Sequence, residues 1–356
     1  MKGTIRIAVL GAGRVAQHYK KMLDLGVVSG YKLVGVCDIN ASAAKILGDH
    51  WGCSSFTDYE TMIANVQPDL ILLLTPSGLH YEHAVIALNA DCNVLVEKPV
   101  TMLPADANDL IRIAKEKKLM LCVAFQNRLN PAIQCLRTAV TDKRFGSIVT
   151  ATIRLRWCRY QDYYEDGWHG TWSQDGGVIN QQAIHHVDAL NWLMGPVESV
   201  CATISNRLNS LEAEDTMVAI IRFESGALGT IEATTAARPQ DYEASLSIVG
   251  EKGLAVIGGI ALNKVETWVF TEPQPDDVDV PSRYSLEVPN GYGLSHGPLL
   301  QSVIKKLLKD DIIAPVPVEQ SVGTTELIHA LYRSHEIGGW VTLKDKPLSI
   351  KLGKRG

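Results

Sequence analysis

The sequence has no excess of positive charge, no long apolar run and no regular spacing of its cysteines. Its 356 residues carry 34 lysines and arginines against 39 acidic residues, a net charge of −5. This balance argues against a nucleic acid or an anionic membrane surface as a partner. No apolar run approaches the ~20 residues of a membrane span, and no secretory segment opens the chain. We therefore expect a soluble, cytoplasmic protein that binds neither nucleic acid nor membrane.

The seven cysteines are odd in number and scattered, with no C-x-x-C pair among them. This usage is typical of buried thiols in a reducing compartment, not of a disulfide framework or a zinc site. The pair His185-His186 stands apart from other metal-ligating residue types. The sequence therefore predicts no bound metal.

What the sequence does contain begins with a short β-branched run at residues 5–10. It ends in Gly11-Ala12-Gly13-Arg14 and continues with helical spacing from Val15. Gly11 permits a tight turn, and Gly13 lets the backbone approach a pyrophosphate. The start of the helix offers N–H donors and the positive end of its dipole. This pattern predicts a phosphate-binding turn.

A second predicted strand ends at Asp38, about 25 residues after the glycines and near the ~20 expected for a ribose-binding acid. A carboxylate at that place accepts a hydrogen bond from the ribose 2′-OH and repels a 2′-phosphate. The alternative is a loop acid or the cap of the next helix. Taken together, the turn and the acid favour NAD over NADP.

Strand and helix patterns alternate up to about Ala124, as a doubly wound parallel sheet requires. From Phe125 onward the pattern changes to strands joined by short turns, which is typical of an antiparallel sheet. We predict an α/β protein with an N-terminal Rossmann domain, residues 1–124, and a C-terminal α/β domain for substrate binding and oligomerisation, residues 125–356. The sheet of the second domain is open and mostly antiparallel. One of its faces must be covered, so we expect a homodimer or homotetramer joined through it.

Ligands of open α/β sheets bind beyond the carboxyl ends of the strands. Lys98 directly follows a predicted strand, and Pro99 disfavours helical geometry there. An amine held near a pyridinium and a histidine has a lowered pKa and can bond a substrate hydroxyl. The alternative is a solvated loop lysine. The polar residues at the predicted strand ends are 11–14, Asp38, 75–80, 97–99 and 126–127.

His185 lies in a predicted helix from about Gly177 to Leu193. Gln181 is four residues earlier and faces the same side, and Asp188, one turn later, can orient the imidazole. A neutral imidazole facing a carbinol takes the hydroxyl proton while hydride leaves to a nicotinamide. The alternative is a core histidine, a description that suits His186 better.

Three motifs together, Gly11-Ala12-Gly13-Arg14, Glu97-Lys98-Pro99 and His185-x-x-Asp188, resemble the Gfo/Idh/MocA oxidoreductase family. The resemblance covers nearly the whole chain and implies NAD as cofactor, with Lys98 and His185 as the catalytic pair. Many members carry Asp where this chain has Gln181, which cannot ionise, so Lys98 and His185 are left to move the proton. The residues expected at the cofactor are Gly11, Gly13, Arg14, Val15, Asp38, Ile39, Thr75, Pro76, Ser77, Leu79, His80, Glu97, Lys98, Gln126 and Trp168.

The second half is more closely similar to the WlbA-type sugar-nucleotide 3-dehydrogenases. These enzymes oxidise C3 of UDP-N-acetylglucosaminuronate or UDP-N-acetylglucosamine, and an aminotransferase then acts on the 3-keto product to make diamino sugars for surface polysaccharide or lipid A. This chain departs from the pattern of those enzymes at His169, because they usually have an arginine at this position. The similarity rests on residues 126–131, 156–164, 167–172, 175–177 and 292–296.

The residue types in this half agree with a nucleotide sugar. Arg128, Arg159 and Arg238 offer fork-shaped donors to a diphosphate. The flat aromatic rings of Tyr163, Tyr164 and Trp168 can stack on a uracil or a sugar. For the aromatic residues the alternative is a core or a subunit interface. Tyr292 and His296 lie in a glycine-rich loop that could close over a ligand. The residues expected at the substrate are Lys98, Arg128, Asn130, Arg159, Tyr163, Gln181, Gln182, His185, Arg238, Tyr292 and His296.

The predicted activity is NAD-dependent oxidation of the C3 hydroxyl of a UDP-N-acetylated sugar. Three alternatives remain: a dehydrogenase of a free sugar or inositol, a glycosidase that uses NAD transiently, and a nucleotide-binding sensor without redox activity. The arginines argue against the first alternative. Lys98 and His185 argue against the last.

Overall fold

The computed structural model describes residues 3–354 and divides them into two compact units. The first unit contains the described residues up to Gln126 together with Leu294–Val322. The second contains Asn127–Gly293 and the residues from Gly323 onward. Within residues 3–354 no helix combines the length and apolar character that crossing a membrane requires.

The first unit is built on a parallel sheet of six strands in the order β3-β2-β1-β4-β5-β6. Its central strands β1 and β4 are almost wholly buried because helices cover both faces, which is why they read as continuous apolar runs. The strands are β1 (Ile5–Leu10), β2 (Tyr31–Cys37), β3 (Ser54–Phe56), β4 (Leu70–Leu73), β5 (Asn93–Val96) and β6 (Leu121–Val123). The helices are α1 (Arg14–Asp24), α2 (Ala41–Trp51), α3 (Tyr59–Val66), α4 (His80–Asn89), α5 (Pro104–Lys117) and α10 (His296–Leu307).

Helix α10 comes from late in the chain and packs against α1. A methyl group added at Gly297 would lie 3.2 Å from Met22 Sδ, so this small residue allows the close approach of the two helices. Further on, the Val123 N–H donates to the carbonyl of Val316 at 3.2 Å, which attaches the same segment to the edge strand β6. Late residues thus complete the core of the early unit.

The second unit is built on an eight-stranded sheet in the order β13-β12-β11-β7-β10-β9-β8-β14. All its pairs are antiparallel except β7 with β10, which is parallel. The predicted α/β class, with a parallel sheet and a second, mostly antiparallel one, is confirmed. The strands are β7 (Ile148–Arg156), β8 (Val197–Ser205), β9 (Thr216–Phe223), β10 (Leu228–Thr234), β11 (Glu243–Gly250), β12 (Gly253–Gly258), β13 (Lys264–Phe270) and β14 (Val341–Thr342).

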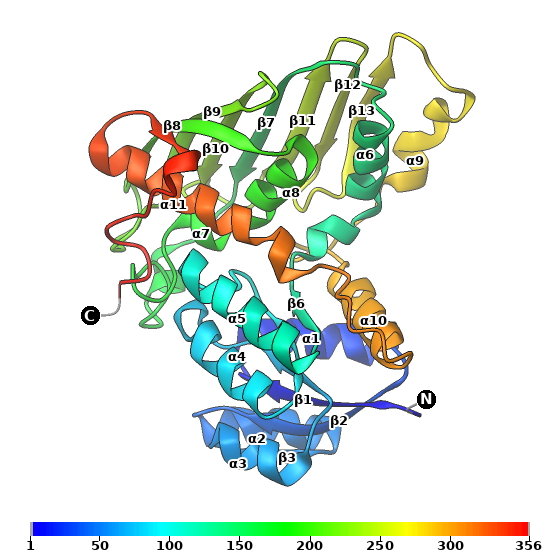
Figure 1. Ribbon diagram of the computed structural model, residues 1–356, viewed down its shortest axis with the longest axis vertical. Coiled ribbons are helices and arrows are strands. Elements are labelled where there is room, and N and C mark those ends of the chain that lie inside the picture. The colour runs from blue at the N-terminus through cyan, green and yellow to red at the C-terminus, as the bar shows by residue number, and fades with distance from the viewer. Residues whose placement is uncertain (1–2, 355–356) are drawn as a thin grey trace. The chain divides into compact units, whose positions relative to one another are not determined.

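The helices of this unit pack on one face of its sheet, as Figure 1 shows for α6 and α8. Alternate residues such as Ile153 and Leu155 are buried beneath them, whereas Val218 and Ile220 on the opposite face are each about half exposed, at 49% and 48%. The predicted helix over 177–193 is two helices, α7 and α8, because the first ends at Gln181. The helices are α6 (Pro131–Thr141), α7 (Val178–Gln181), α8 (Ile184–Met194), α9 (Val280–Tyr284) and α11 (Val322–Ile337).

Candidate functional site

The turn after β1 has the geometry that a dinucleotide needs. Gly11 has φ +99°, and a Cβ there would lie 2.7 Å from the Leu74 carbonyl oxygen, so only glycine fits. No atom lies within 4 Å of a Cβ built on Gly13, and no side chain caps the start of α1. A helix start without a side-chain cap, next to a glycine that leaves its surroundings open, is the arrangement that binds a phosphate group in proteins of this fold.

Asp38 is held firmly at the end of β2. Its Oδ2 accepts the Ala12 N–H at 2.7 Å and its Oδ1 accepts the Asn40 N–H at 2.8 Å. Asn40, not Asp38, caps α2, so the alternative role of Asp38 as that cap is wrong. Ile39 is 97% exposed beside it. The acid is thus fixed against the glycine turn, as a ribose ligand requires.

The loops after β4 and β5 are joined by the buried imidazole of His80. Its Nε2 lies 2.8 Å from the Thr75 carbonyl oxygen and its Nδ1 lies 2.7 Å from that of Pro99. Burial lowers the pKa of His80, against the opposing effect of those two carbonyls. Ser77 is buried nearby, at 3% exposure. The predicted cofactor contact of His80 remains a prediction, since both ring nitrogens already face protein carbonyls.

Glu97, which directly precedes Lys98, is buried. Its Oε1 lies 3.4 Å from the Tyr19 hydroxyl and 3.6 Å from Nε2 of His296, and its Oε2 accepts the Lys98 N–H at 3.3 Å. Burial by itself raises the pKa of Glu97, but the hydrogen bond and charge of His296 and the charge of Lys98 outweigh it and leave that pKa lowered. The carboxyl is therefore ionised, while the Lys98 side chain is half-buried.

The structure separates two residues that the sequence places in one closing loop. His296 is 2% exposed and belongs to the first unit, where its ring packs against those of His18 and Tyr19. Tyr292 belongs to the second unit and is 39% exposed. The glycine-rich loop therefore spans the point where the chain passes from one unit to the other.

His185 and His186 differ in the way that the sequence predicts. His185 lies in α8 and is half-buried, whereas His186 is fully buried with its ring edge toward Trp157. Burial lowers the pKa of His186 to about 3, so this ring is neutral. The spacing predicts that Asp188 orients His185. In the structure both Asp188 oxygens receive N–H groups of Arg128, at 2.7 Å each.

Gln181 and Gln182 are buried and face different partners. The Gln181 amide donates to Oδ1 of Asp175, whose other oxygen accepts the Gly170 N–H at 2.8 Å. The Gln182 amide donates to the Tyr163 hydroxyl at 3.3 Å. Gln181 thus connects α7 to the loop that carries the aromatic residues.

The aromatic residues predicted for a flat ligand do cluster. The Tyr163 ring lies 4.3 Å from the His169 ring and 5.0 Å from the Tyr164 ring, and the Trp168 ring lies 3.6 Å from His169. Arg159 joins them, with its guanidinium 5.6 Å from the Tyr163 ring centre and 2.8 Å from Asp241. This assembly, which we call the aromatic cluster, comprises Arg159, Tyr163, Tyr164, Trp168 and His169.

The other residues that the sequence predicts at the substrate are more dispersed. Arg238 donates to the Thr235 carbonyl at 3.1 Å and stacks on Tyr160. The Asn130 amide donates to the carbonyls of Ala261 and Leu262, at 2.8 and 3.2 Å. The three predicted diphosphate-binding arginines, Arg128, Arg159 and Arg238, each have protein partners. Their role toward a diphosphate remains a prediction.

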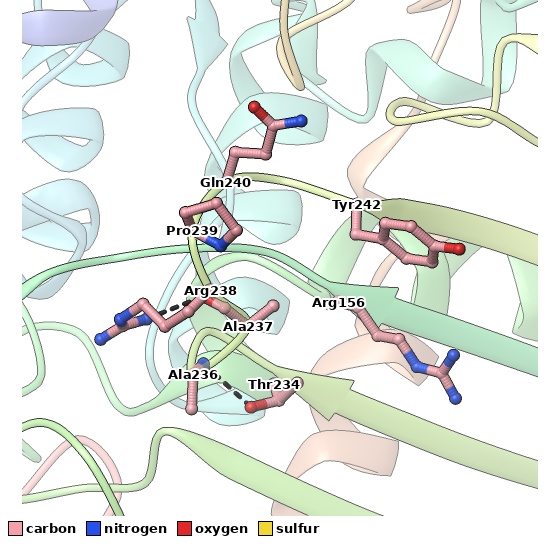
Figure 2. A pocket seen from close by; sticks show the side chains of 8 residues that line it. All are labelled: Arg156, Thr234, Ala236, Ala237, Arg238, Pro239, Gln240 and Tyr242. Carbon is pink, nitrogen blue, oxygen red and sulfur yellow. Dashed lines mark hydrogen bonds between the residues drawn. The ribbon is translucent and has the colours of Figure 1, made fainter.

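A shallow cavity of about 360 Å³ opens beside Arg238 at the end of β7 and β10. Figure 2 shows Arg238 on one side of it and Arg156 and Tyr242 on the other. Arg156 is bound by Glu232 at 2.7 Å. Because Leu155 and Ala233 are buried, their neighbours along each strand point to the opposite, helix-free face of the sheet. The cavity therefore opens on that face.

One group of buried polar residues has no signal in the sequence. Glu214 is fully buried, and its Oε1 accepts the Ile179 N–H and the Tyr332 hydroxyl, both at 3.0 Å. The Tyr332 hydroxyl also accepts the Gly177 N–H at 3.0 Å. These contacts hold the first turn of α7, which precedes Gln181 and His185. Glu214 lies in the loop before β9 and Tyr332 lies in α11, so no local pattern could identify them.

Comparison with known proteins adds family-level information. The model for an oxidoreductase family with an NAD-binding Rossmann fold matches residues 5–125, and that for the Gfo/Idh/MocA C-terminal domain matches residues 133–256. The chain is similar to the solved WlbA dehydrogenase of Chromobacterium violaceum in complex with NADH and UDP-GlcNAcA, with 33% identity and a TM-score of 0.88 over 96% of each chain.

Two curated relatives are also similar. A D-glucoside 3-dehydrogenase of Escherichia coli is 30% identical over 71% of this chain and 77% of its own length. A UDP-N-acetylglucosamine 3-dehydrogenase of Acidithiobacillus ferrooxidans is 32% identical over 38% of this chain and 41% of its own.

Proposed function

Because this chain belongs to the Gfo/Idh/MocA oxidoreductase family and binds NAD, we propose that it oxidises the C3 hydroxyl of a UDP-linked N-acetylated sugar to the 3-keto sugar. The observation that carries the proposal is the similarity to the WlbA dehydrogenase over 96% of both chains, since that enzyme was solved with a UDP-sugar. The names of both curated relatives also specify oxidation at C3 of a sugar.

NAD, held by the Gly11–Arg14 turn and Asp38, supplies the hydride acceptor when bound. The role of the protein is to remove the hydroxyl proton and to hold the sugar in register. We assign proton removal to the half-buried His185 and stabilisation of the C3 oxygen to Lys98. Gln181 is bound to Asp175 and cannot ionise, so its role is to hold the end of α7, which directly precedes the helix that carries His185.

The sugar nucleotide has two groups that the second unit can recognise. The rings of the aromatic cluster offer flat surfaces for a uracil or a sugar, and the Arg159 guanidinium beside them offers donors to a diphosphate. Arg238 and Tyr292 are further candidates. The contact of His296 with substrate stays a prediction, since this residue is buried against Glu97.

We further propose that the 3-keto product passes to an aminotransferase, since a ketone is the functional group that such an enzyme converts to an amine. A second copy of the chain is proposed to cover the helix-free face of the large sheet. Exposed apolar residues recur on strands across that face: Val218, Ile220, Leu228, Val249, Leu254 and Val269.

A second candidate function is oxidation of a glucoside that carries no nucleotide. It is favoured by the 30% identity to the D-glucoside 3-dehydrogenase, which extends over 71% of this chain. The two functions differ in what they require of the aromatic cluster, since a free glucoside has neither a uracil nor a diphosphate.

The decisive experiment offers NAD with UDP-GlcNAcA, UDP-GlcNAc and methyl glucoside in parallel. NADH is followed by absorbance and the 3-keto product by mass spectrometry. We expect turnover of one or both UDP-sugars. Turnover of methyl glucoside alone would establish the second candidate, and hydrolysis of a glycoside without accumulation of NADH would indicate a glycosidase.

A further inference from the structure

Two neighbouring residues of the second unit, Ala213 and Glu214, hold two different parts of the candidate site. The Ala213 N–H donates to the Gly170 carbonyl at 2.9 Å, and the Glu214 carbonyl accepts the Val178 N–H at 2.9 Å. The Glu214 side chain adds a further bond, because its Oε1 accepts the Ile179 N–H at 3.0 Å. The loop before β9 therefore holds the Gly170 turn and the start of α7 at once.

The carboxyl group of Glu214 is packed directly against the start of α7. A Cβ added at Gly177 would overlap this carboxyl group, so only glycine fits there. The Tyr332 hydroxyl lies between the two residues, since it accepts the Gly177 N–H and donates to Glu214 Oε1, both at 3.0 Å. Glu214 is fully buried, and a buried N–H that loses its acceptor is costly. The position of α7 therefore depends on the Glu214 carboxyl.

The two parts held in this way lead to different residues of the proposed site. The Gly170 turn closely follows Trp168 of the aromatic cluster, and α7 leads into α8, which carries His185. Asp175 joins the two parts as well, since it accepts the Gly170 N–H and the amide of Gln181 at the end of α7. A movement of one part is therefore transmitted to the other.

We propose that Glu214 is a positioning residue that fixes the aromatic cluster and the helix of His185 relative to each other. In this role it acts on the protein and not on the substrate, by accepting hydrogen bonds at the start of α7. The inference rests on the proposed function for the roles of the cluster and of His185. A misplacement of about 1 Å can lower a reaction rate by about 10²-fold, so the loss of these bonds should lower turnover.

The first test needs no substrate. The full-length protein is labelled with ¹⁵N-tryptophan, and the indole N–H resonance of Trp168 is assigned by its loss in Trp168→Phe. In Glu214→Ala we expect this resonance to move by more than its linewidth, because α7 and the Gly170 turn can then shift. Glu214→Gln keeps a carbonyl oxygen for Ile179 and Tyr332, so it should leave the resonance at its wild-type position.

Asp277→Asn is the matched control, because Asp277 is an acid of the same unit with a tryptophan partner of its own. Its side chain is 12% exposed and accepts the indole N–H of Trp268 at 2.8 Å. This variant should move the Trp268 resonance and leave that of Trp168 in place. A Trp168 resonance that does not move in Glu214→Ala, or that moves equally in Asp277→Asn, would overturn the proposal. If Glu214→Ala does not fold, Tyr332→Phe replaces it in the same comparison.

The second test asks whether Glu214 acts through His185. With NAD and the UDP-sugar, Glu214→Ala should lower kcat by about 10- to 100-fold, and Glu214→Gln should retain most of the activity. In a His185→Ala background the same Glu214→Ala substitution should lower kcat by a much smaller factor, since residues that act as a unit are not additive. Equal factors in the two backgrounds would count against the proposal and remove His185 from the action of Glu214.

The tryptophan resonances also separate this inference from the proposed function. If no UDP-sugar is oxidised but the Trp168 resonance moves in Glu214→Ala and not in the control, the positioning role stands and the substrate assignment fails. If UDP-sugars are oxidised and the resonance does not move, the substrate assignment stands and the positioning role fails.

Discussion

Arg128 and Asp188 form a buried ion pair with two hydrogen bonds. Nε to Oδ2 and Nη2 to Oδ1 are both 2.7 Å, the two side chains are 4% and 1% exposed, and the Thr324 hydroxyl adds a third donor to Asp188 at 3.0 Å. The pair fixes α8, and with it His185, to the segment that leads into α6. Arg128 therefore has a structural role whether or not it also binds a diphosphate.

We expect Asp188→Asn to destabilise the protein by about 3–5 kcal/mol, because it leaves a buried guanidinium without its counter-charge. The double variant Arg128→Met, Asp188→Leu should recover much of that loss, since it removes both charges. Chemical denaturation measures the free energy of unfolding of each protein. If the double variant is stable and keeps the wild-type KM for the UDP-sugar, Arg128 does not bind the substrate.

Lys98→Ala and His185→Ala should each lower kcat by about 10²–10⁴-fold, the usual contribution of a positioned acid or base. Both variants should still bind NAD, because neither side chain contributes to the Gly11–Arg14 turn. Steady-state kinetics and titration of NAD binding test this, with Lys115→Ala on the exposed face of α5 as control. Near-normal turnover in either variant would remove that residue from the mechanism.

Asp38→Ala should weaken NAD binding by about 10–100-fold, since a hydrogen bond to a charged group contributes about 1.5–3 kcal/mol. It should also narrow the preference for NAD over NADP, because the repulsion of a 2′-phosphate disappears. The ratio of kcat/KM for the two cofactors is the measurement. Asp49→Ala, an acid on the exposed face of α2 paired with Lys45, controls for the loss of a surface charge.

The stability of the protein should depend on pH through Glu214. Burial raises the pKa of this carboxyl from 4.5 to about 8. The folded protein therefore holds a proton that the unfolded chain releases, and the free energy of unfolding falls as pH rises from about 4.5 to about 8. Glu214→Gln should flatten this slope and keep the acceptor for Ile179 and Tyr332. Chemical denaturation at pH 5, 6.5 and 8 gives the free energy of unfolding of the wild-type protein and of Glu214→Gln. If that free energy depends on pH equally in both proteins, the raised pKa of Glu214 is contradicted.

The helix-free sheet face should mediate self-association. Val218→Lys with Ile220→Lys places two charges in the middle of the apolar patch and should convert the wild-type oligomer to a monomer, because burying an unpaired charge is costly. Light scattering after size-exclusion chromatography gives the mass. Leu208→Lys, at an exposed apolar residue in the loop between β8 and β9, is the control. A wild-type monomer would reject the proposed dimer or tetramer.

The sequence alone was sufficient for features that depend on local order along the chain. The Gly11 turn follows from a backbone constraint that only glycine meets, and the parallel sheet follows from alternating strand and helix patterns. The contrast between His185 and His186 follows from helical spacing. The predicted helix over 177–193 is an exception. The apolar periodicity of the sequence continues across Gln182-Ala183, but the helical backbone is interrupted there.

Only the tertiary structure decided which polar groups share a buried environment. Arg128 meets Asp188, Glu214 meets Tyr332, and Glu97 meets His296 across separations of 60, 118 and 199 residues. No periodicity or motif records such pairs, because their partners are set by how the elements pack. The energy of a buried charge depends on those partners, and for that reason the surroundings of Asp188 and Glu97 emerge from the fold and not from the order of residues.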